Sequence, residues 1–465
     1  MLTKDQAAAI FSKLKAYAAT DEVEATFYGG QSALTRFANN TIHQNVAEEH
    51  YGVSVRTTFG GRTARATTNK FDDSSLQQVV KASAALAQVQ EPDPDQLSMP
   101  DTAEACGKTA ASPSNIPRRY FDQTAATTAD DRAQAVETMV DIARHYKLTA
   151  AGIFATSDAI EGVFNSRGIA DWHQQTSSDI SITMLAGNSS GWQKANSPNV
   201  GDLDPPRLAE TAAGKALQSA NPSPLPAGKY TVILEPAAVL DIIGFMFYDF
   251  GGLAILDQRS FLNNRIGKRI FGENINISDD VAHPLQSGAP FDGEGMRRKR
   301  VSLVENGVVK RLVYARGSAA KMTQSEHAQN VGLVEATGHG FPLPNEMGEA
   351  PTNIVFGGPD QPKTVDQMIA STDRGVLVTR LWYIREVDPY EKILTGMTRD
   401  GTFYIENGKL RHGVLNFRFN ESLLHMLSNV EEMGEPVRAS GEESFDMVVP
   451  AMKVREFNFT EVTKF

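Results

Sequence analysis

The segment that most constrains this fold runs from Pro236 to Phe250 and reads PAAVLDIIGFMFYDF. Proline suits a first helical turn because the N–H that it lacks has no intrahelical partner there. Gly251-Gly252 ends the run, as glycines commonly end helices. Apolar side chains surround the predicted helix, so it has to be buried on every side. With the short apolar run Thr231–Leu234 before it, the sequence predicts a strand leading into a core helix.

Composition narrows the class of protein. A length of 465 residues predicts two or more domains, and a net charge of −11 gives no support to nucleic-acid binding. The single cysteine, Cys106, excludes an intrachain disulfide, and we interpret it as an incidental thiol that suits a reducing compartment. No stretch approaches the roughly 20 apolar residues of a membrane span, and the N-terminus has no apolar signal core. We expect a cytoplasmic protein.

The first half of the chain shows one pattern twice. A helix over 4–19 precedes short strand-like runs with predicted turns at Gly29-Gly30, Asn39-Asn40 and Gly60-Gly61, and a helix over 76–88 follows. Similar features recur over 127–220, where VFNSRGIADWHQ parallels RFANNTIHQ. The pattern predicts a duplicated helix, antiparallel meander and helix sharing one sheet. The copies span about 1–90 and 127–220, joined by a proline-rich extended connection over 90–118.

The alternating prolines of Asn221–Gly228 predict the boundary between an N-terminal α/β domain over 1–221 and a β-rich domain over 229–465. In the second domain, Asn306-Gly307 and Asn407-Gly408 each separate two β-rich runs, which is a strong signal for a hairpin. A helix is expected over 422–429, and the runs 447–450 and 453–459 are expected to pair as a final strand pair. The fold class expected is α+β.

Four stretches after the apolar segment carry a family resemblance. They read RSFLNNRIGKRIFGENINISDD, PFDGEGMRRKRVSLVENGVV, STDRGVLVTRLWYIREVDP and TGMTRDGTFYIENGKL. The chain resembles the TldD/PmbA (TldE) family, described as metallopeptidases and as modulators of DNA gyrase. The resemblance covers nearly the whole chain and is strongest over about 230–430. It implies a C-terminal domain built on a curved, barrel-like, mostly antiparallel β-sheet around the core helix.

The zinc motif of the family is missing from this chain. In the TldD branch the core helix carries H-E-x-x-x-H, and that frame falls here on Gly244–Asp249 without either histidine or the glutamate. The family also has a cysteine ligand near the C-terminus, whereas Ser440–Phe465 contains none. The chain therefore resembles the PmbA/TldE branch, which keeps the fold and lacks the metal site. No catalytic or metal-binding residue is expected.

The resemblance implies a role as a partner subunit. In the family, a zinc-bearing TldD subunit and a PmbA/TldE subunit form a heterodimeric peptidase acting on unfolded or modified peptides. This chain would then hold no cofactor, zinc being expected only in the partner, and would be inactive alone. Two alternatives remain open: a stand-alone peptide-binding homodimer that captures extended chains by strand addition, and a peptidase with relocated active-site chemistry.

Candidate substrate-lining residues follow the motifs of the resemblance: Phe245, Asp249, Asp292, His339 and Trp382. Asp249 stands in the frame of the second histidine, but one carboxylate does not make a cation site. Asp292, in FDGEG, either orients a substrate or stabilises a turn, and the turn is favoured. His339 lies in a glycine-containing loop, where a surface histidine is the favoured interpretation over a ligand. Trp382 lines a peptide groove or packs in the core.

The only dense basic run is Met296–Arg300. In an acidic protein, a solvated hairpin edge is favoured over a nucleic-acid patch. No phosphate-binding loop or serine-nucleophile motif occurs.

Overall fold

The computed structural model describes residues 1–106 and 116–463. Its first half is built on one antiparallel sheet with the strand order β3-β2-β1-β4-β5-β6, in which β1 and β4 lie side by side at the centre. The strands are β1 (Glu22–Ala38), β2 (Thr41–Phe59), β3 (Arg62–Thr68), β4 (Thr149–Asn165), β5 (Ala170–Ala186) and β6 (Ser189–Ser197).

The central strands are longer than the sequence predicts. The expected turn at Gly29-Gly30 is wrong, because β1 runs straight through these residues and pairs with β2 and β4 on either side. Any side chain at Gly29 would collide with the His50 carbonyl of β2, and any at Gly30 with the Asp158 carbonyl of β4. Here the glycines allow close approach of neighbouring backbones rather than a change of direction.

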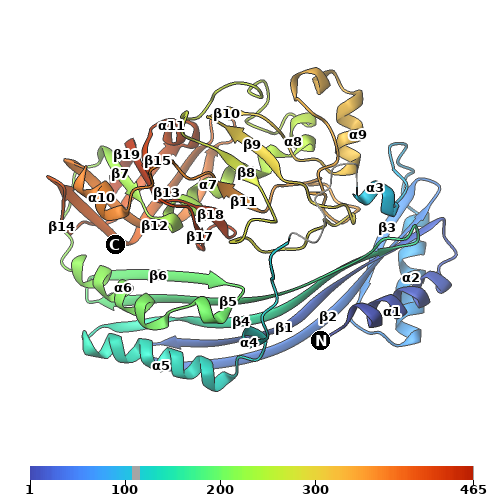
Figure 1. The fold of residues 1–465 in the computed structure, drawn as a ribbon, viewed down its shortest axis with the longest axis horizontal. Helices are drawn as coiled ribbons and strands as arrows, with labels where there is room; N and C mark the ends of the chain where they lie inside the picture. Colours follow the sequence, from blue (N-terminus) through green and yellow to red (C-terminus); the bar gives the residue numbers. More distant parts are fainter. Residues whose placement is uncertain (107–115, 464–465) are drawn as a thin grey trace.

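Helices cover one face of this sheet in two pairs (Figure 1). The pair α1 (Lys4–Tyr17) and α2 (Asp73–Gln88) packs on one end with Phe27 and Val55, and the pair α5 (Ala129–His145) and α6 (Pro205–Gln218) on the other with Phe154 and Ile182. All four helices lie where the periodicity predicts them. Side chains cap each N-terminus, namely Thr3, Asp72, Thr128 and Asp204.

The connection over 90–118 is only in part the extended segment that was expected. Its described portion contains the short helix α3 (Thr102–Cys106), held by Glu104 against Arg316 of the C-terminal half at 2.7 Å. Cys106 is exposed, and the rest of the prediction, over 107–115, lies outside the described residues. The short helix α4 (Asp122–Ala125) follows before α5.

The C-terminal half contains a closed barrel of five strands. Its strands are β7 (Gly228–Leu234), β12 (Arg374–Asp388), β13 (Ile393–Glu406), β15 (Phe417–Ser422) and β19 (Met452–Val462), and the β12–β13 pairing closes the circle. The hairpin strand β14 (Lys409–Gly413) extends β13, β16 (Val430–Met433) pairs with β19, and the helices α10 (Val365–Ala370) and α11 (Leu423–Ser428) pack nearby. The predicted barrel-like sheet is confirmed.

A second sheet lies beside the barrel in the order β10-β9-β8-β11-β18-β17. Its strands are β8 (Ile277–Asp279), β9 (Val301–Glu305), β10 (Val308–Val309), β11 (Ile354–Phe356), β17 (Val437–Ala439) and β18 (Met447–Val449). The expected pairing of 447–450 with 453–459 is wrong: β18 pairs with β17 and β11, whereas β19 crosses into the barrel. Both Asn-Gly hairpins are confirmed, with positive φ at all four residues.

The apolar segment is a helix only in its first part. Helix α7 (Pro236–Ile243) is buried, but the chain then tightens into the 3-10 segment η3 (Gly244–Phe250), followed by α8 (Gly252–Leu256). Complete burial is also wrong, because Phe245 is half-buried and Tyr248 is 54% exposed. Within the described residues, no helix is long and apolar enough to cross a membrane.

The C-terminal half lies over the sheet face opposite the helices (Figure 1). Ser190 of β6 donates to Asp400 of β13 at 2.6 Å, and Lys194 donates to the Gly441 carbonyl at 2.7 Å. Farther along, the Gln175 side chain accepts the Gly288 N–H at 2.8 Å. These contacts join the sheet to the barrel, to the loop before β18 and to the segment between β8 and β9.

Candidate functional site

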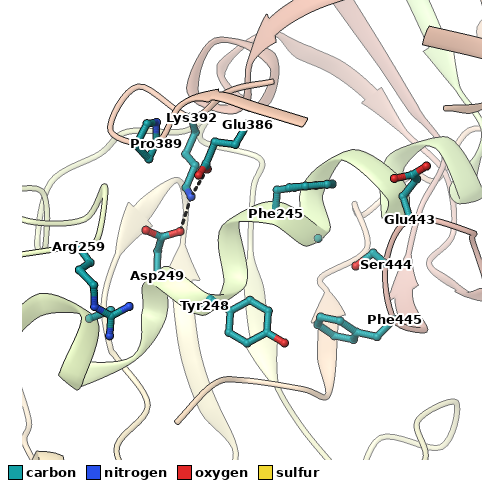
Figure 2. A pocket seen from close by; sticks show the side chains of 12 residues that line it. Phe245, Tyr248, Asp249, Arg259, Glu386, Pro389, Lys392, Glu443, Ser444 and Phe445 are labelled. Carbon is teal, nitrogen blue, oxygen red and sulfur yellow. Dashed lines mark hydrogen bonds and ion pairs between the residues drawn. The ribbon is translucent and has the colours of Figure 1, made fainter. Parts of the chain in front are cut away.

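A cleft with a volume of about 520 Å³ opens beside η3. One wall is η3 itself, a second is the end of hairpin β12–β13, and a third is the loop before β18 (Figure 2). Its lining mixes aromatic and charged side chains, which include Phe245, Tyr248, Asp249, Glu386, Lys392 and Phe445. The cleft therefore places the Gly244–Asp249 frame at a surface that a ligand can reach.

The charged centre of the cleft is an ammonium between two carboxylates. Lys392, only 4% exposed, lies 2.6 Å from Asp249 and 2.6 Å from Glu386 (Figure 2). The other Asp249 oxygen accepts the Phe261 N–H at 3.0 Å. Burial raises the pKa of Asp249, and Lys392 opposes that shift. Both oxygens of Asp249 are therefore already engaged by groups of this chain.

Aromatic rings extend the cleft toward the N-terminal sheet. Tyr248 and Phe445 line the cleft and also a neighbouring cavity of about 430 Å³. That cavity continues to Glu161 and Gln175 on the sheet and to Arg298 on the other side. The two cavities therefore share a wall that contains an exposed tyrosine, and together they are called the groove below.

A buried aspartate of α7 holds the third wall in place. Asp241 is 0% exposed, and its Oδ1 accepts the N–H groups of Glu442 and Glu443, each at 3.0 Å. Its Oδ2 has no hydrogen-bond partner among the residues that the structure describes. Burial raises the pKa of Asp241 to about 7. The loop that carries Ser444 and Phe445 into the cleft is thus fixed from behind by a carboxyl group. The sequence analysis did not find this role.

The frame residues do not fit a zinc ion. Gly244 supplies no ligand, and any side chain there would collide with Ser444. Phe245 is apolar, and Asp249 is held by Lys392. In the described part of the chain, no group of three or more His, Cys, Asp or Glu side chains is arranged to hold a metal. The side chains of this frame therefore do not support zinc chemistry.

Asp292 and His339 lie together but not in the cleft. Asp292 accepts the N–H groups of Glu294 and Met296 at 2.9 Å and of Gly340 at 2.7 Å, which fits the interpretation as a turn-stabilising residue. The surface interpretation of His339 is wrong: it is 2% exposed and its Nε2 lies 2.9 Å from Asp279. Asp292 and His339 therefore fix the conformation of adjoining loops.

Two further buried carboxylates join these loops, and the sequence analysis missed their role. Glu294 accepts the Arg316 N–H at 3.0 Å, and Glu349 accepts the N–H groups of Leu253 at 2.8 Å and Ala315 at 3.1 Å. Burial raises the pKa of both, and nearby Asp292 adds to the shift of Glu294. The signal available was their position among glycines, since FDGEG and MGE place acids where backbone amides are accessible.

Trp382 lies at the junction of β12 with the N-terminal sheet rather than among the residues that line the cleft. It is half-buried, with the guanidinium of Arg380 5.3 Å and that of Arg399 5.0 Å from its ring centroid. Arg380 also lies over Trp192 of β6 at 4.7 Å. Trp382 therefore lies next to a contact between the halves that Arg380 makes with Trp192.

The basic run is not a solvated edge, because most of its side chains have partners. Met296 is buried, Arg297 pairs with Asp171 at 2.6 Å, and Lys299 pairs with Glu335 at 2.8 Å. Arg298 donates to Thr352 at 2.7 Å. Ion pairs and hydrogen bonds account for this run, which links two halves of the chain through Asp171.

Comparison with known families gives the class of protein. Residues 227–461 match the PmbA/TldA metallopeptidase C-terminal domain, and residues 23–87 match the PmbA/TldA metallopeptidase domain 1. These are metallopeptidase-like domains, and one match falls in each half of the fold. The chain belongs to the PmbA/TldD family.

Curated relatives agree with this assignment. A metalloprotease PmbA homologue of Haemophilus influenzae is 21% identical over 450 residues, 94% of this chain and 92% of the relative. Metalloprotease PmbA of Escherichia coli is 22% identical, over 69% of this chain and 68% of the relative. An uncharacterised protein of Methanocaldococcus jannaschii is 25% identical, and the match spans 60% of its length and 57% of this chain.

Solved structures share the fold. TldE from Thermococcus kodakarensis superposes with a TM-score of 0.84 at 18% identity, covering 99% of this chain and 100% of that one. A protein of Thermotoga maritima described as a modulator of a DNA gyrase gives a TM-score of 0.83 at 19% identity, covering 97% of this chain and 100% of that one.

Proposed function

We propose that this chain is a metal-free, PmbA/TldE-like subunit that binds peptide and acts with a zinc-bearing TldD-like paralogue. One observation carries the proposal: Lys392 places its ammonium 2.6 Å from Asp249, the acid that stands in the metal-binding frame. A side-chain cation thus pairs with the carboxylate that would otherwise attract a metal ion. Zinc then belongs to the partner subunit, and this chain has no catalytic residue of its own.

The groove supports peptide binding. Tyr248 and Phe445 line both of its cavities, and its walls carry carboxylates and cations as well as aromatic rings. Aromatic side chains with a polar end are common anchors for peptide ligands, because they bury a large area and still donate a hydrogen bond. An unfolded or modified peptide segment fits this chemistry. A cytoplasmic location agrees with the single unpaired cysteine.

A second candidate function, a homodimer that captures extended chains, is favoured by one feature of β2. Residues 41–50 of this strand pair with β1 on one side, whereas β3 begins to pair with β2 only at Val53. Most of these side chains are exposed, and the outer backbone edge is available for strand addition.

We also infer that the N-terminal region, residues 1–221, is a domain that arose by duplication, separate from a domain over 229–465. The strand order places β1–β3 and β4–β6 symmetrically about the β1–β4 pair, each with a preceding and a following helix. Superposing 1–90 on 127–220 with the same strand order tests the duplication.

The test of the function combines metal analysis with reconstitution. The purified chain should contain no stoichiometric zinc and cleave no peptide, and it should stimulate peptide cleavage by a TldD-like paralogue from the same host. Tyr248→Ala should weaken that stimulation while leaving subunit binding unchanged, whereas Tyr146→Ala, an exposed tyrosine following α5, should change neither.

Zinc near one per chain that is removed together with peptidase activity would overturn the proposal. Peptide capture by the chain alone, lost when Val46→Pro blocks the free edge of β2 but not with Tyr248→Ala, would favour the homodimer instead.

A further inference from the structure

A separate cavity lies on the helix-covered face of the N-terminal sheet. It has a volume of about 420 Å³ and is lined by β1, β2, β4, α4 and the start of α5. Thr156 and Asp158 of β4 line it, whereas Glu161 of the same strand lines the groove. Because alternate residues of a strand point to opposite faces, this cavity and the groove lie on opposite sides of the sheet.

The cavity contains a buried cation. Arg132 of α5 is 2% exposed, and all four groups that accept its hydrogen bonds are neutral. Its Nε donates to Thr35 at 3.3 Å and one terminal nitrogen donates to the Thr127 carbonyl at 3.1 Å and to Thr156 at 3.3 Å. The other terminal nitrogen reaches the Asn45 side chain at 3.4 Å.

Other buried arginines have shorter contacts, although the Nε of Arg119 has no partner among the described residues. Three have carboxylate partners: Arg56 with Glu24 at 2.8 Å, Arg316 with Glu104 at 2.7 Å and Arg380 with Asp400. Arg119 has three backbone carbonyls at 2.9 to 3.0 Å. Among the buried arginines of the described chain, Arg132 has neither a carboxylate at ion-pair distance nor hydrogen bonds as short as these.

A buried cation with no described carboxylate at ion-pair distance is costly, so the cavity beside it favours an anionic ligand. Burial lowers the pKa of the Arg132 guanidinium from its ordinary value, and the charge of neighbouring Asp131 partly opposes that shift. The walls are small or polar, with Ser32, Ala33, Thr124 and Thr127 among them, so they suit a small polar molecule rather than an apolar one.

A carboxylate in the same cavity, that of Asp158, restricts the chemical class of ligand that can bind there. This aspartate lines the same cavity, and its Oδ1 accepts the Gln31 N–H at 3.0 Å. Besides the negative charge that pairs with Arg132, a second negative charge on the ligand would be repelled by the Asp158 carboxylate, whereas a positive charge would be attracted by it. We propose that the cavity binds a small zwitterion, an amino acid or dipeptide, with its carboxylate on Arg132 and its ammonium group toward Asp158. This site is independent of the proposed function of the groove.

Isothermal titration of the full chain with L-alanine, L-alanyl-L-alanine, acetate and inorganic phosphate tests the proposal. We expect saturable binding of one of the two zwitterions. Acetate should bind more weakly than this zwitterion, and phosphate should not bind more tightly than it. Arg132→Gln should weaken zwitterion binding about tenfold or more, because a charge-assisted contact is lost. Arg144→Gln, an exposed arginine of the same helix paired with Asp141 at 2.8 Å, should leave binding unchanged.

Ala47→Leu keeps Arg132 and fills part of the cavity from β2, so this variant should also abolish binding. It tests the site independently if Arg132→Gln does not fold. Circular dichroism checks that each variant is folded. Phosphate binding tighter than either zwitterion would overturn the ligand class. Absence of binding by the wild-type chain, or binding that survives Ala47→Leu, would overturn the site.

Discussion

Two buried aspartates lie eight residues apart on one segment, at Asp241 in α7 and Asp249 in η3, and they are satisfied in different ways. Asp241 is held by two backbone N–H groups and leaves one oxygen without a partner. Asp249 is held by a lysine and one backbone N–H. The first acid positions a wall of the groove, whereas the second neutralises a cation within it. The two aspartates therefore have separate roles, and substitutions at the two places should change the free energy of unfolding in different ways.

The largest effect is expected from Lys392→Met. Removing one partner of a buried ion pair typically costs about 3–5 kcal/mol, because the remaining charge is left unpaired. We expect the free energy of unfolding, measured with urea, to fall by that order. Lys229→Met, at an exposed lysine with an exposed partner, should change it by less than about 1 kcal/mol.

Combining Lys392→Met with Asp249→Leu should recover much of the loss, since the buried carboxylate is then removed together with the ammonium and the remaining partner, Glu386, is partly exposed to solvent. If Lys392→Met costs no more than Lys229→Met, the ammonium is not needed to neutralise Asp249 and the contrast with Asp241 fails.

An intermediate effect, dependent on pH, is expected from Asp241→Asn. The folded-state pKa of Asp241 is about 7, above the ordinary unfolded value of about 3.9. The folded state therefore retains a proton that the unfolded state loses, so stability is greatest below pH 4 and declines as pH rises to 7. The decline attributable to this group is at most about 4 kcal/mol.

The measurement is the difference between the wild-type and Asp241→Asn free energies of unfolding at several pH values. We expect the asparagine variant to gain stability relative to wild type across this interval, with the difference constant above it. Asp257→Asn, an exposed aspartate after α8, should give a flat difference. A flat difference for Asp241→Asn as well would show that Asp241 ionises normally in the folded chain.

The smallest effect on stability is expected from Phe245→Ala. Full burial of this ring would predict a loss of about 3–5 kcal/mol on truncation, but Phe245 is half-buried and faces the cleft, so we expect about 1–2 kcal/mol. Phe247→Ala, two residues on and 0% exposed, should cost the full 3–5 kcal/mol. Equal losses in thermal or urea unfolding would show that η3 is packed on both sides like α7.

Local signals predicted much of the fold. Apolar periodicity identified the helices of the N-terminal half, and Asn-Gly pairs identified both hairpins, because these patterns depend on residues close together in the sequence. Gly29-Gly30 misled for a physical reason: glycine serves a turn and a close strand contact equally well, and only the neighbouring strands distinguish the two.

The site was less predictable, because its contacts join distant residues. The family frame identified Asp249 and Phe245 as lining residues, but no local pattern indicated that Lys392 would pair with Asp249. His339 was interpreted as a surface residue because glycines surround it, although it is 2% exposed and pairs with Asp279 of β8. Trp382 was assigned to a groove or the core from its size and apolar neighbours, whereas the structure places it half-buried beside the guanidinium groups of Arg380 and Arg399.

The position of β7 in the barrel has a consequence for how the protein is made. This strand begins at Gly228 and lies between β12 and β19, the latter at Met452–Val462. Its partners are therefore synthesised long after it, and loops with such distant ends form slowly. The nascent chain must keep an apolar strand and helix α7 from aggregating until β19 emerges, whereas the N-terminal sheet can complete its pairing earlier. Chaperone demand during synthesis should accordingly concentrate on the second half of the chain.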